Sequence, residues 1–74
     1  DPGSGGMKAV TGKRMAKLAE QKGWLLARIN GSHHVYTQAG RIERVVIPIH
    51  GNRALKIGLQ RSLMQIIPVT EGEL

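Results

Sequence analysis

The sequence contains no cysteine and no phenylalanine, and its only aromatic residues are Trp24 and Tyr36. Without cysteine the chain has no disulfide framework, no cysteine-based zinc site and no thiol nucleophile. Two aromatic side chains are too few for a surface that stacks successive bases of a single strand. Recognition of bases by stacking is therefore disfavoured.

Long apolar runs are also missing. No stretch reaches the roughly 18 apolar residues that span a bilayer, and no signal peptide is visible, so we expect a cytosolic protein. Residues 1–6 (DPGSGG) resemble a cloning scar before a native Met7. Residues 7–68 predict a single small domain, and residues 69–74 predict a loose C-terminal tail.

Acidic side chains are scarce. Residues 7–68 hold all eleven Lys and Arg but only Glu20 and Glu43, which gives this stretch a net charge of +9. Such an excess on a small fold creates a positive potential that attracts polyanions such as nucleic acid. The alternative is a basic surface that binds no partner and only keeps the protein soluble. A membrane-surface role is weaker, because neither expected helix pairs a basic face with large aromatic side chains.

The apolar spacing predicts five elements in the order α-β-β-β-α. Thr11 caps a helix over residues 11–22 that Gly23 ends, and a second helix runs from residue 55 or 56 to residue 67. Alternating and β-branched runs predict three strands, over residues 24–29, 33–37 and 41–48. A three-stranded antiparallel sheet with both helices on one face is an α+β fold that leaves the other face free for a partner. The expected core includes Leu18, Trp24, Val46, Leu59 and Leu63.

The turn before the second expected strand carries the sequence GSHH at residues 31–34. Histidine takes and gives a proton near neutral pH, because its ordinary pKa is about 6.5. His33 is therefore a candidate general acid/base for RNA cleavage, in which a ribose 2′-hydroxyl attacks the adjacent phosphate. The alternative is a turn histidine that only hydrogen-bonds the backbone. His34 is expected on the opposite face, because side chains alternate along a strand.

Ser32 and His50 are possible supporting residues. The native part holds no aspartate for a catalytic triad, so we expect the Ser32 hydroxyl to hydrogen-bond the turn or a phosphate. His50 follows the third strand, where it is a second proton-transfer group, a phosphate contact or an ordinary surface residue. Adjacent histidines are poor joint ligands for one metal ion, so we expect neither a metal site nor another cofactor.

Basic side chains from strands and loops are expected to surround the His33 end of the sheet and bind RNA phosphates. Lys56 and Gly58 open the second helix, where free N–H groups and the helix dipole favour a phosphate. The expected RNA-binding residues are Arg28, Arg41, Arg44, Arg53, Lys56 and Gly58.

Three segments together resemble the HicA (YcfA-like) mRNA interferase toxin family. Residues 23–36 read GWLLARINGSHHVY, similar to the family's GW, apolar run and R-I-x-G-S-H motif. IPIH at residues 47–50 resembles V-P-x-H, and K-x-G-L at residues 56–59 with Leu63 resembles K-x-G-T-L-x-x-I-L. The likeness covers nearly all of residues 12–67 in order and spacing.

The resemblance implies a fold like that of double-stranded RNA-binding domains. It also implies a ribosome-independent ribonuclease that a cognate HicB-type antitoxin neutralises, with His33 as the catalytic histidine of the G-S-H motif. Leu59 stands where the family usually has threonine, which removes one phosphate-binding hydroxyl. The sequence after Leu63 also departs from the usual R-Q-A-G ending.

The favoured hypothesis is a toxin that cleaves mRNA by metal-free transesterification, with His33 as general acid/base and a HicB-type antitoxin as protein partner in a hetero-oligomer. A non-catalytic RNA-binding module of the same fold is the alternative. A third hypothesis is a domain whose basic face binds only an acidic protein. The three hypotheses make different predictions about whether the protein cleaves RNA and whether it binds RNA in a salt-sensitive way.

Overall fold

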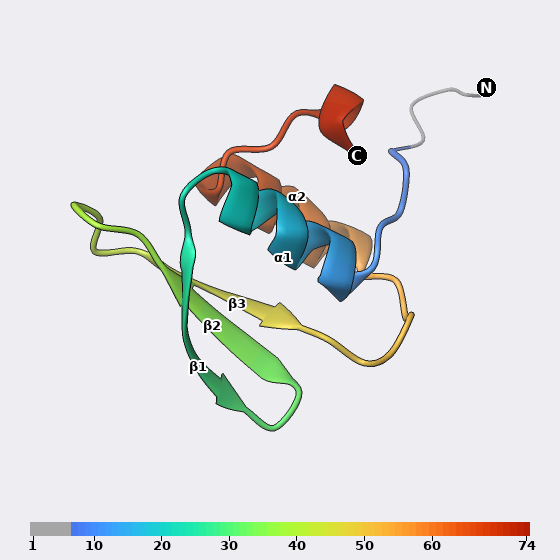
Figure 1. The fold of residues 1–74 in the computed structure, drawn as a ribbon. Helices are drawn as coiled ribbons and strands as arrows, with labels where there is room; N and C mark the ends of the chain where they lie inside the picture. The colour runs from blue at the N-terminus through green and yellow to red at the C-terminus, as the bar shows by residue number, and fades with distance from the viewer. Residues whose placement is uncertain (1–6) are drawn as a thin grey trace.

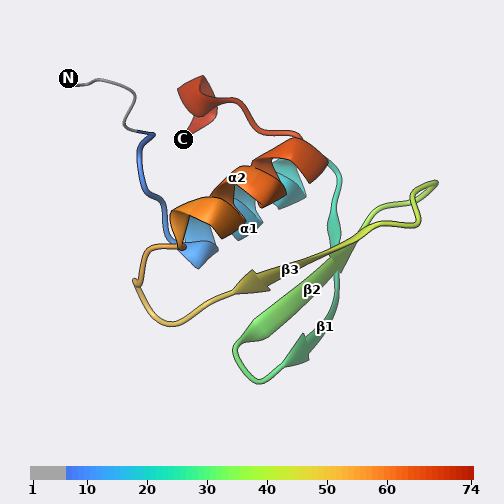
Figure 2. The ribbon, with the colours of Figure 1, turned by 180° about the vertical axis from the view of Figure 1, so that it is seen from behind.

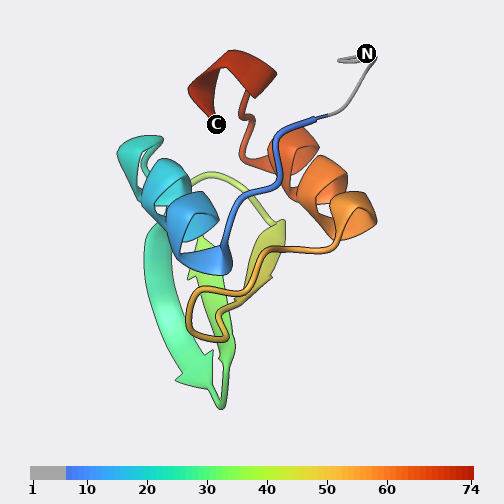
Figure 3. The ribbon, with the colours of Figure 1, turned by 90° about the vertical axis from the view of Figure 1, so that its right-hand side faces the viewer.

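Two helices lie on one face of a three-stranded antiparallel sheet (Figures 1 and 3). The computed structural model describes residues 7–74, and the expected cloning scar at residues 1–6 lies outside them. The elements are α1 (Gly12–Gln21), β1 (Leu25–Asn30), β2 (His33–Thr37), β3 (Arg44–Pro48), α2 (Ile57–Ile66) and the 3₁₀ turn η1 (Glu71–Glu73). The α-β-β-β-α order and the α+β fold class are confirmed. None of the helices described in residues 7–74 is long and apolar enough to cross a membrane.

Local sequence signals set the limits of α1. The Thr11 hydroxyl caps the helix by accepting a hydrogen bond from the Arg14 amide at 3.1 Å. Gly23, with a φ of +91°, follows the helix, because glycine adopts this left-handed conformation without strain. Trp24 then donates its amide to the Ala19 carbonyl oxygen at 3.0 Å and turns its side chain into the core.

The core lies between the sheet and the two helices. Val45 and Ile47 of β3 point toward the helices and are almost fully buried. Trp24 is also buried, and its indole Nε1 donates to the Ile67 carbonyl oxygen at 3.0 Å. This hydrogen bond joins the start of β1 to the end of α2.

Two residues that the sequence placed in the core are exposed instead. Val46 is 43% exposed, because it alternates with Val45 and Ile47 and so faces the open side of the sheet. Leu59 is 36% exposed, because Gln60, the next residue along α2, occupies the buried position. Neighbouring residues of a helix point about 100° apart, so with Gln60 turned fully into the core Leu59 lies at the margin of the buried face.

Gln60 is fully buried and has hydrogen-bond partners for both ends of its side-chain amide. Its Oε1 accepts from the Val10 amide at 3.0 Å, and its Nε2 donates to the Lys8 carbonyl oxygen at 2.7 Å. These bonds satisfy polar groups that would otherwise be unpaired in the core. They also fasten the chain before α1 to α2, alongside the Leu55 amide, which donates to the Val10 carbonyl oxygen at 2.8 Å.

Elements β1, β3 and α2 begin later than the sequence predicted, β1 by one residue. The third strand starts at Arg44 and not at residue 41, because residues 38–43 form the loop of a hairpin. In that loop the Arg41 amide donates to the Gln38 carbonyl oxygen at 3.1 Å, which makes a turn. Helix α2 starts at Ile57, one or two residues after its expected start.

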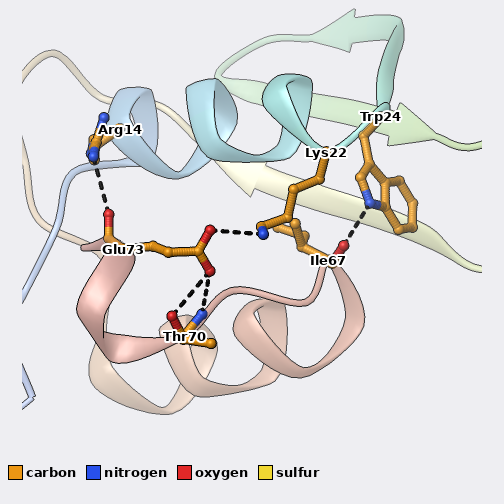
Figure 4. A network of polar contacts seen from close by, with 6 residues as sticks. All are labelled: Arg14, Lys22, Trp24, Ile67, Thr70 and Glu73. Atoms are coloured by element: carbon orange, nitrogen blue, oxygen red, sulfur yellow. Dashed lines mark hydrogen bonds and ion pairs between the residues drawn. The ribbon is translucent and has the colours of Figure 1, made fainter.

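Residues 69–74, expected to be a loose tail, pack against the helices. Val69 is buried, and η1 carries Glu73, whose Oε2 lies 2.7 Å from Lys22 Nζ (Figure 4). The Glu73 Oε1 accepts from the Thr70 amide at 2.8 Å, and the Glu73 carbonyl oxygen accepts from Arg14 Nη2 at 3.1 Å. The expected tail is therefore an ordered segment fastened to α1.

Glu73 makes this attachment sensitive to acid. The hydrogen bond from Lys22, and then that from the Thr70 amide, lower the pKa of Glu73 from 4.5 to about 2. A carboxyl whose pKa is lower in the folded state stabilises the fold above its unfolded pKa. That stabilisation is lost as the pH falls from about 4.5 toward 2. Glu73→Gln should lower the urea midpoint at pH 7 and reduce its further fall on acidification.

The measurement is urea unfolding between pH 7 and pH 2.5, with Glu71→Gln as the matched control from the same turn. Glu71→Gln removes one equal charge but does not remove the contact with Lys22, so its midpoints should follow those of the wild type. Equal behaviour of the two variants would contradict the role of Glu73.

Gly12 marks a close approach of α1 to the end of β3. A Cβ added at Gly12 would overlap the Pro48 carbonyl oxygen, so a side chain there must displace backbone. Gly12→Ala should lower the free energy of unfolding by about 1–3 kcal/mol, although alanine is the better helix former. In the control Gly58→Ala, nothing lies within 4 Å of the added Cβ. That variant should keep its stability or gain up to about 1 kcal/mol. Urea unfolding followed by circular dichroism measures the free energy of unfolding of both variants. A Gly12→Ala protein as stable as the wild type would contradict the close contact.

Candidate functional site

The turn between β1 and β2 is attached to the loop that follows β3. Gly31 has a φ of +63°, and this left-handed conformation lets the chain reverse direction sharply. The carbonyl oxygen of Ser32 accepts the Ile49 amide at 2.8 Å, and the Ser32 Oγ lies 3.2 Å from the His50 Nε2. Two hydrogen bonds therefore hold Ser32, and with it the first residue of β2, against the loop after β3.

His33 is the first residue of β2 and is exposed. Its direct cross-strand neighbours are Asn30 on β1 and Pro48 on β3. Val35, two residues further along β2, pairs with the exposed Val46, so His33 and Val35 share the face of the sheet that the helices leave open. The imidazole is thus accessible to a large ligand on that face.

His34 lies on the opposite face, as the alternation of side chains predicts. It is half-buried and borders a hollow of about 460 Å³ that α1 and the helix side of the sheet form together. Lys13 and Lys17 of α1 border the same hollow. The two adjacent histidines therefore belong to different surfaces, and only His33 lies on the open face.

Arg28 and Arg44 lie on the open face with His33. Both are exposed, and both border a shallow hollow of about 230 Å³ together with Val35 and Thr37. Arg28 pairs with Val35, two residues along β2 from His33. Arg44 pairs with Thr37 at the opposite end of β2, so it lies beside the hairpin between β2 and β3 and not at the His33 end where the sequence predicted it. These guanidinium groups give the face a positive charge that can neutralise phosphates.

His50, Arg53 and Lys56 come from the loop that joins β3 to α2 (Figure 2). All three are exposed and border a second hollow, of about 300 Å³, which also includes Pro48. Because Pro48 is the cross-strand neighbour of His33, this hollow adjoins the His33 end of the sheet.

The start of α2 offers further donors for an anion. Lys56 is the N-cap residue, and its side chain makes no capping hydrogen bond. The first amides of a helix have no partner within the helix, and they favour a phosphate. At Gly58 no atom lies within 4 Å of an added Cβ, so a ligand can approach the backbone there.

Arg41, the remaining basic residue expected at the site, lies at the other end of the sheet. The hairpin between β2 and β3 carries it, and Figure 1 shows that hairpin far from the turn between β1 and β2. Its guanidinium carbon is 5.1 Å from the centre of the Trp24 ring, and its Nη1 donates to the Ile66 carbonyl oxygen at 3.0 Å. Its Nε also donates to Glu43 at 3.3 Å, and this hydrogen bond lowers the pKa of Glu43. Arg41 therefore holds the hairpin against the core.

His33 and the exposed cations provide the chemical groups that a reaction at a phosphate requires. An exposed imidazole can exchange protons, and four cations on two adjacent surfaces can stabilise charge that develops on a phosphate. Within residues 7–74 no three His, Cys, Asp or Glu side chains come together in a way that could hold a metal ion.

Sequence reasoning did not find the Ser32–His50 contact or the hollow beside it. The antiparallel pairing of β2 with β3 was predicted, and in that pairing the end of β3 lies beside the start of β2. The IPIH segment therefore had to lie near the GSH turn. The direction of the His50 side chain depends on the loop conformation, for which the sequence carried no signal.

Comparison with known protein families gives one match. The family model described as "HicA toxin of bacterial toxin-antitoxin" matches residues 12–67, which is most of the 74-residue chain. The matched range includes α1, the sheet and α2, and with them every residue of the site described above. No curated protein matches the chain.

Arg41 and Arg44 allow a test of the division between structural and free cations. Arg41→Gln should lower the free energy of unfolding by about 1–2 kcal/mol, because it removes a cation–π contact and a charged hydrogen bond to a carbonyl oxygen. Arg44→Gln makes the same chemical change at an exposed position and should alter stability by no more than about 0.5 kcal/mol. Urea unfolding measures both, and equal losses would contradict the structural role of Arg41.

Proposed function

We propose that this chain, which belongs to the HicA toxin family of bacterial toxin–antitoxin systems, is an endoribonuclease that cleaves mRNA with His33 as general acid/base. The observation that carries the proposal is the position of His33. It is exposed on the open face of the sheet, where Arg28 pairs with Val35, the next residue of β2 on that face. Directly across from His33 lies Pro48, which borders the hollow beside His50. A cationic surface therefore lies on either side of one accessible imidazole.

In the proposed reaction, neutral His33 takes the proton of a ribose 2′-hydroxyl. The 2′-oxygen then forms a bond to the adjacent phosphorus while the bond from phosphorus to the 5′-oxygen breaks. The leaving 5′-oxygen receives a proton from an imidazolium, so one product ends in a 2′,3′-cyclic phosphate and the other in a 5′-hydroxyl. His33 returns the proton itself, or His50 serves as the second group.

The cations and the Ser32 turn have distinct roles in this proposal. Arg28 and Lys56 bind phosphates on the two sides of the scissile bond and offset the negative charge of the transition state. The contact between Ser32 and His50 fixes the turn that carries His33. Such fixing matters, because general acid/base catalysis requires the imidazole within hydrogen-bond reach of the reacting hydroxyl.

Membership of a toxin–antitoxin family implies an antitoxin partner. We propose a HicB-type antitoxin with an acidic surface that covers His33 and the cations around it. The edge strand β1 supports a protein partner at this edge of the sheet, because it exposes three large apolar residues, one on the His33 face and two on the helix side, beside an unpaired strand edge. These residues are Leu25, Leu26 and Ile29. An mRNA substrate would place the activity in the cytoplasm.

His33→Ala should lower the rate of RNA cleavage by about 10²- to 10⁴-fold, the usual contribution of a positioned proton-transfer group. The matched control is His34→Ala, which removes the same side chain from the other face and should keep most of the activity. Gel analysis of single-stranded RNA incubated with each protein in chelator measures the rates. Circular dichroism checks the fold, and analysis of the product ends should find a cyclic phosphate.

The outcomes separate the three hypotheses. Equal cleavage by wild type and His33→Ala would remove His33 from the mechanism. Salt-sensitive RNA binding by the wild type without strand scission would favour a non-catalytic RNA-binding module. No measurable RNA affinity near physiological salt would favour a domain that binds only an acidic protein.

A further inference from the structure

The hollow beside His50 has a chemical character different from that of the open sheet face. Its rim carries three side chains that bind anions, from His50, Arg53 and Lys56. Its wall is apolar and is formed mainly by Pro48, Leu55 and Leu59. Leu59, which the sequence placed in the core, contributes its exposed part to this wall.

The frame of the hollow is held in place from several sides. The Arg53 amide donates to the His50 carbonyl oxygen at 3.0 Å, which closes a turn within the loop. Leu55 is buried, and its amide donates to the Val10 carbonyl oxygen at 2.8 Å. Ala54 forms a β-bridge with Thr11, and the His50 Nε2 lies 3.2 Å from the Ser32 Oγ. The hollow therefore exists before any ligand binds.

The size and lining select the class of ligand. A volume of about 300 Å³ is at the lower end of the range of about 300–1,000 Å³ for small-molecule sites, so it suits one nucleotide and not a longer segment. An inorganic phosphate or an acidic side chain would leave the apolar wall uncovered. A purely apolar side chain would displace the water around His50, Arg53 and Lys56 and would offer these polar groups no hydrogen bond in its place. A flat base against the wall with its phosphate at the rim satisfies both parts.

The hollow also lies in the right place relative to the proposed catalytic residue. Pro48 of its wall is the cross-strand neighbour of His33, and His50 of its rim contacts the residue before His33. A nucleotide in the hollow would therefore directly adjoin the nucleotide whose phosphate reaches His33. On the other side of His33, the smaller hollow between Arg28 and Arg44 borders the proposed path of the RNA.

We propose that this hollow binds the base of the nucleotide next to the scissile phosphate and thereby determines the sequence preference of cleavage. The inference rests on the proposed ribonuclease function. Leu59 is the specificity-determining wall residue, and Arg53 and Lys56 bind the phosphate of the same nucleotide. Filling the hollow should change which sequences are cut more than it changes how fast RNA is cut.

Binding is tested first, without any need for catalysis. The His33→Ala chain, labelled with ¹⁵N, is titrated with each of the four 5′-nucleoside monophosphates and with inorganic phosphate. We expect at least one nucleotide to bind at least threefold more tightly than phosphate and to shift amides of residues 50–59. A second substitution, Leu59→Trp, should abolish that difference. The matched control Ile57→Trp, an exposed residue of the same helix turn that does not border the hollow, should keep it.

Cleavage specificity is tested second, by sequencing the products of a randomised RNA. For the wild type we expect a base preference at one position beside the cut, and for Leu59→Trp a loss of at least tenfold in that preference. Ile57→Trp should keep the preference. Unchanged preference in Leu59→Trp, or equal binding of phosphate and nucleotides, would overturn the inference. If the wild type cuts no RNA, the ribonuclease proposal fails, and the titration alone then decides whether the hollow binds a nucleotide.

Discussion

The hydrogen bond from the Ile49 amide to the Ser32 carbonyl oxygen, at 2.8 Å, is the interaction on which the proposed site depends. It lies just beyond the last paired residues of β2 and β3 and extends their ladder into the turn. Because of it, the tight turn at Gly31 has a fixed position relative to the loop that carries His50. The contact between Ser32 and His50 adds a side-chain bond at the same point. Together with the pairing of His33 and Pro48, these bonds hold the turn before His33 against the loop that carries the second hollow.

Seven of the eleven basic side chains form two groups with different surroundings. Arg14 and Lys22 contact Glu73 of the C-terminal segment, and Arg41 contacts Trp24, Glu43 and the end of α2. These three side chains stabilise the fold on the helix side and at the far hairpin. Four exposed cations of the open face and the adjoining hollow have no ion-pair partner within residues 7–74, and they are Arg28, Arg44, Arg53 and Lys56. Among residues 7–74, the acidic side chains that form ion pairs are Glu43 and Glu73, and their partners are Arg41 and Lys22, so the described ion pairs do not neutralise the positive charge near His33.

The features that could be predicted from the sequence are those set by local chemistry. Thr11 and Gly23 predicted the limits of α1, and the alternation of side chains predicted that His33 and His34 lie on opposite faces. The misplacement of Val46 is a misreading of a local pattern, since alternation with Val45 and Ile47 already puts it on the other face. The failures at Gln60, at residues 69–74 and at Arg41 concern contacts between distant segments. Gln60 takes a core position on α2 because Lys8 and Val10 supply partners for its amide, and no local pattern indicates this. Residues 69–74 are ordered for the same reason, since Glu73 finds its partners on α1. Net charge predicted a cationic surface, but it could not indicate that Arg41 packs on the core while Arg44 is exposed. The contact between Arg41 and Trp24 joins two segments and appears only in the folded structure.

Under the proposed function, the exposure of His33 bears on inhibition by a partner as well as on cleavage. In water, the attraction between an exposed cation and a phosphate is weak, and it strengthens when a ligand covers the site and lowers the local dielectric constant. An RNA strand that lies across the open face would itself create the environment in which Arg28 and Lys56 stabilise developing charge. An acidic protein surface on the same face would meet the same cations, and those cations cannot neutralise two polyanions at once. Substrate and antitoxin are therefore expected to compete, and a partner that covers only this face can inhibit without changing the fold.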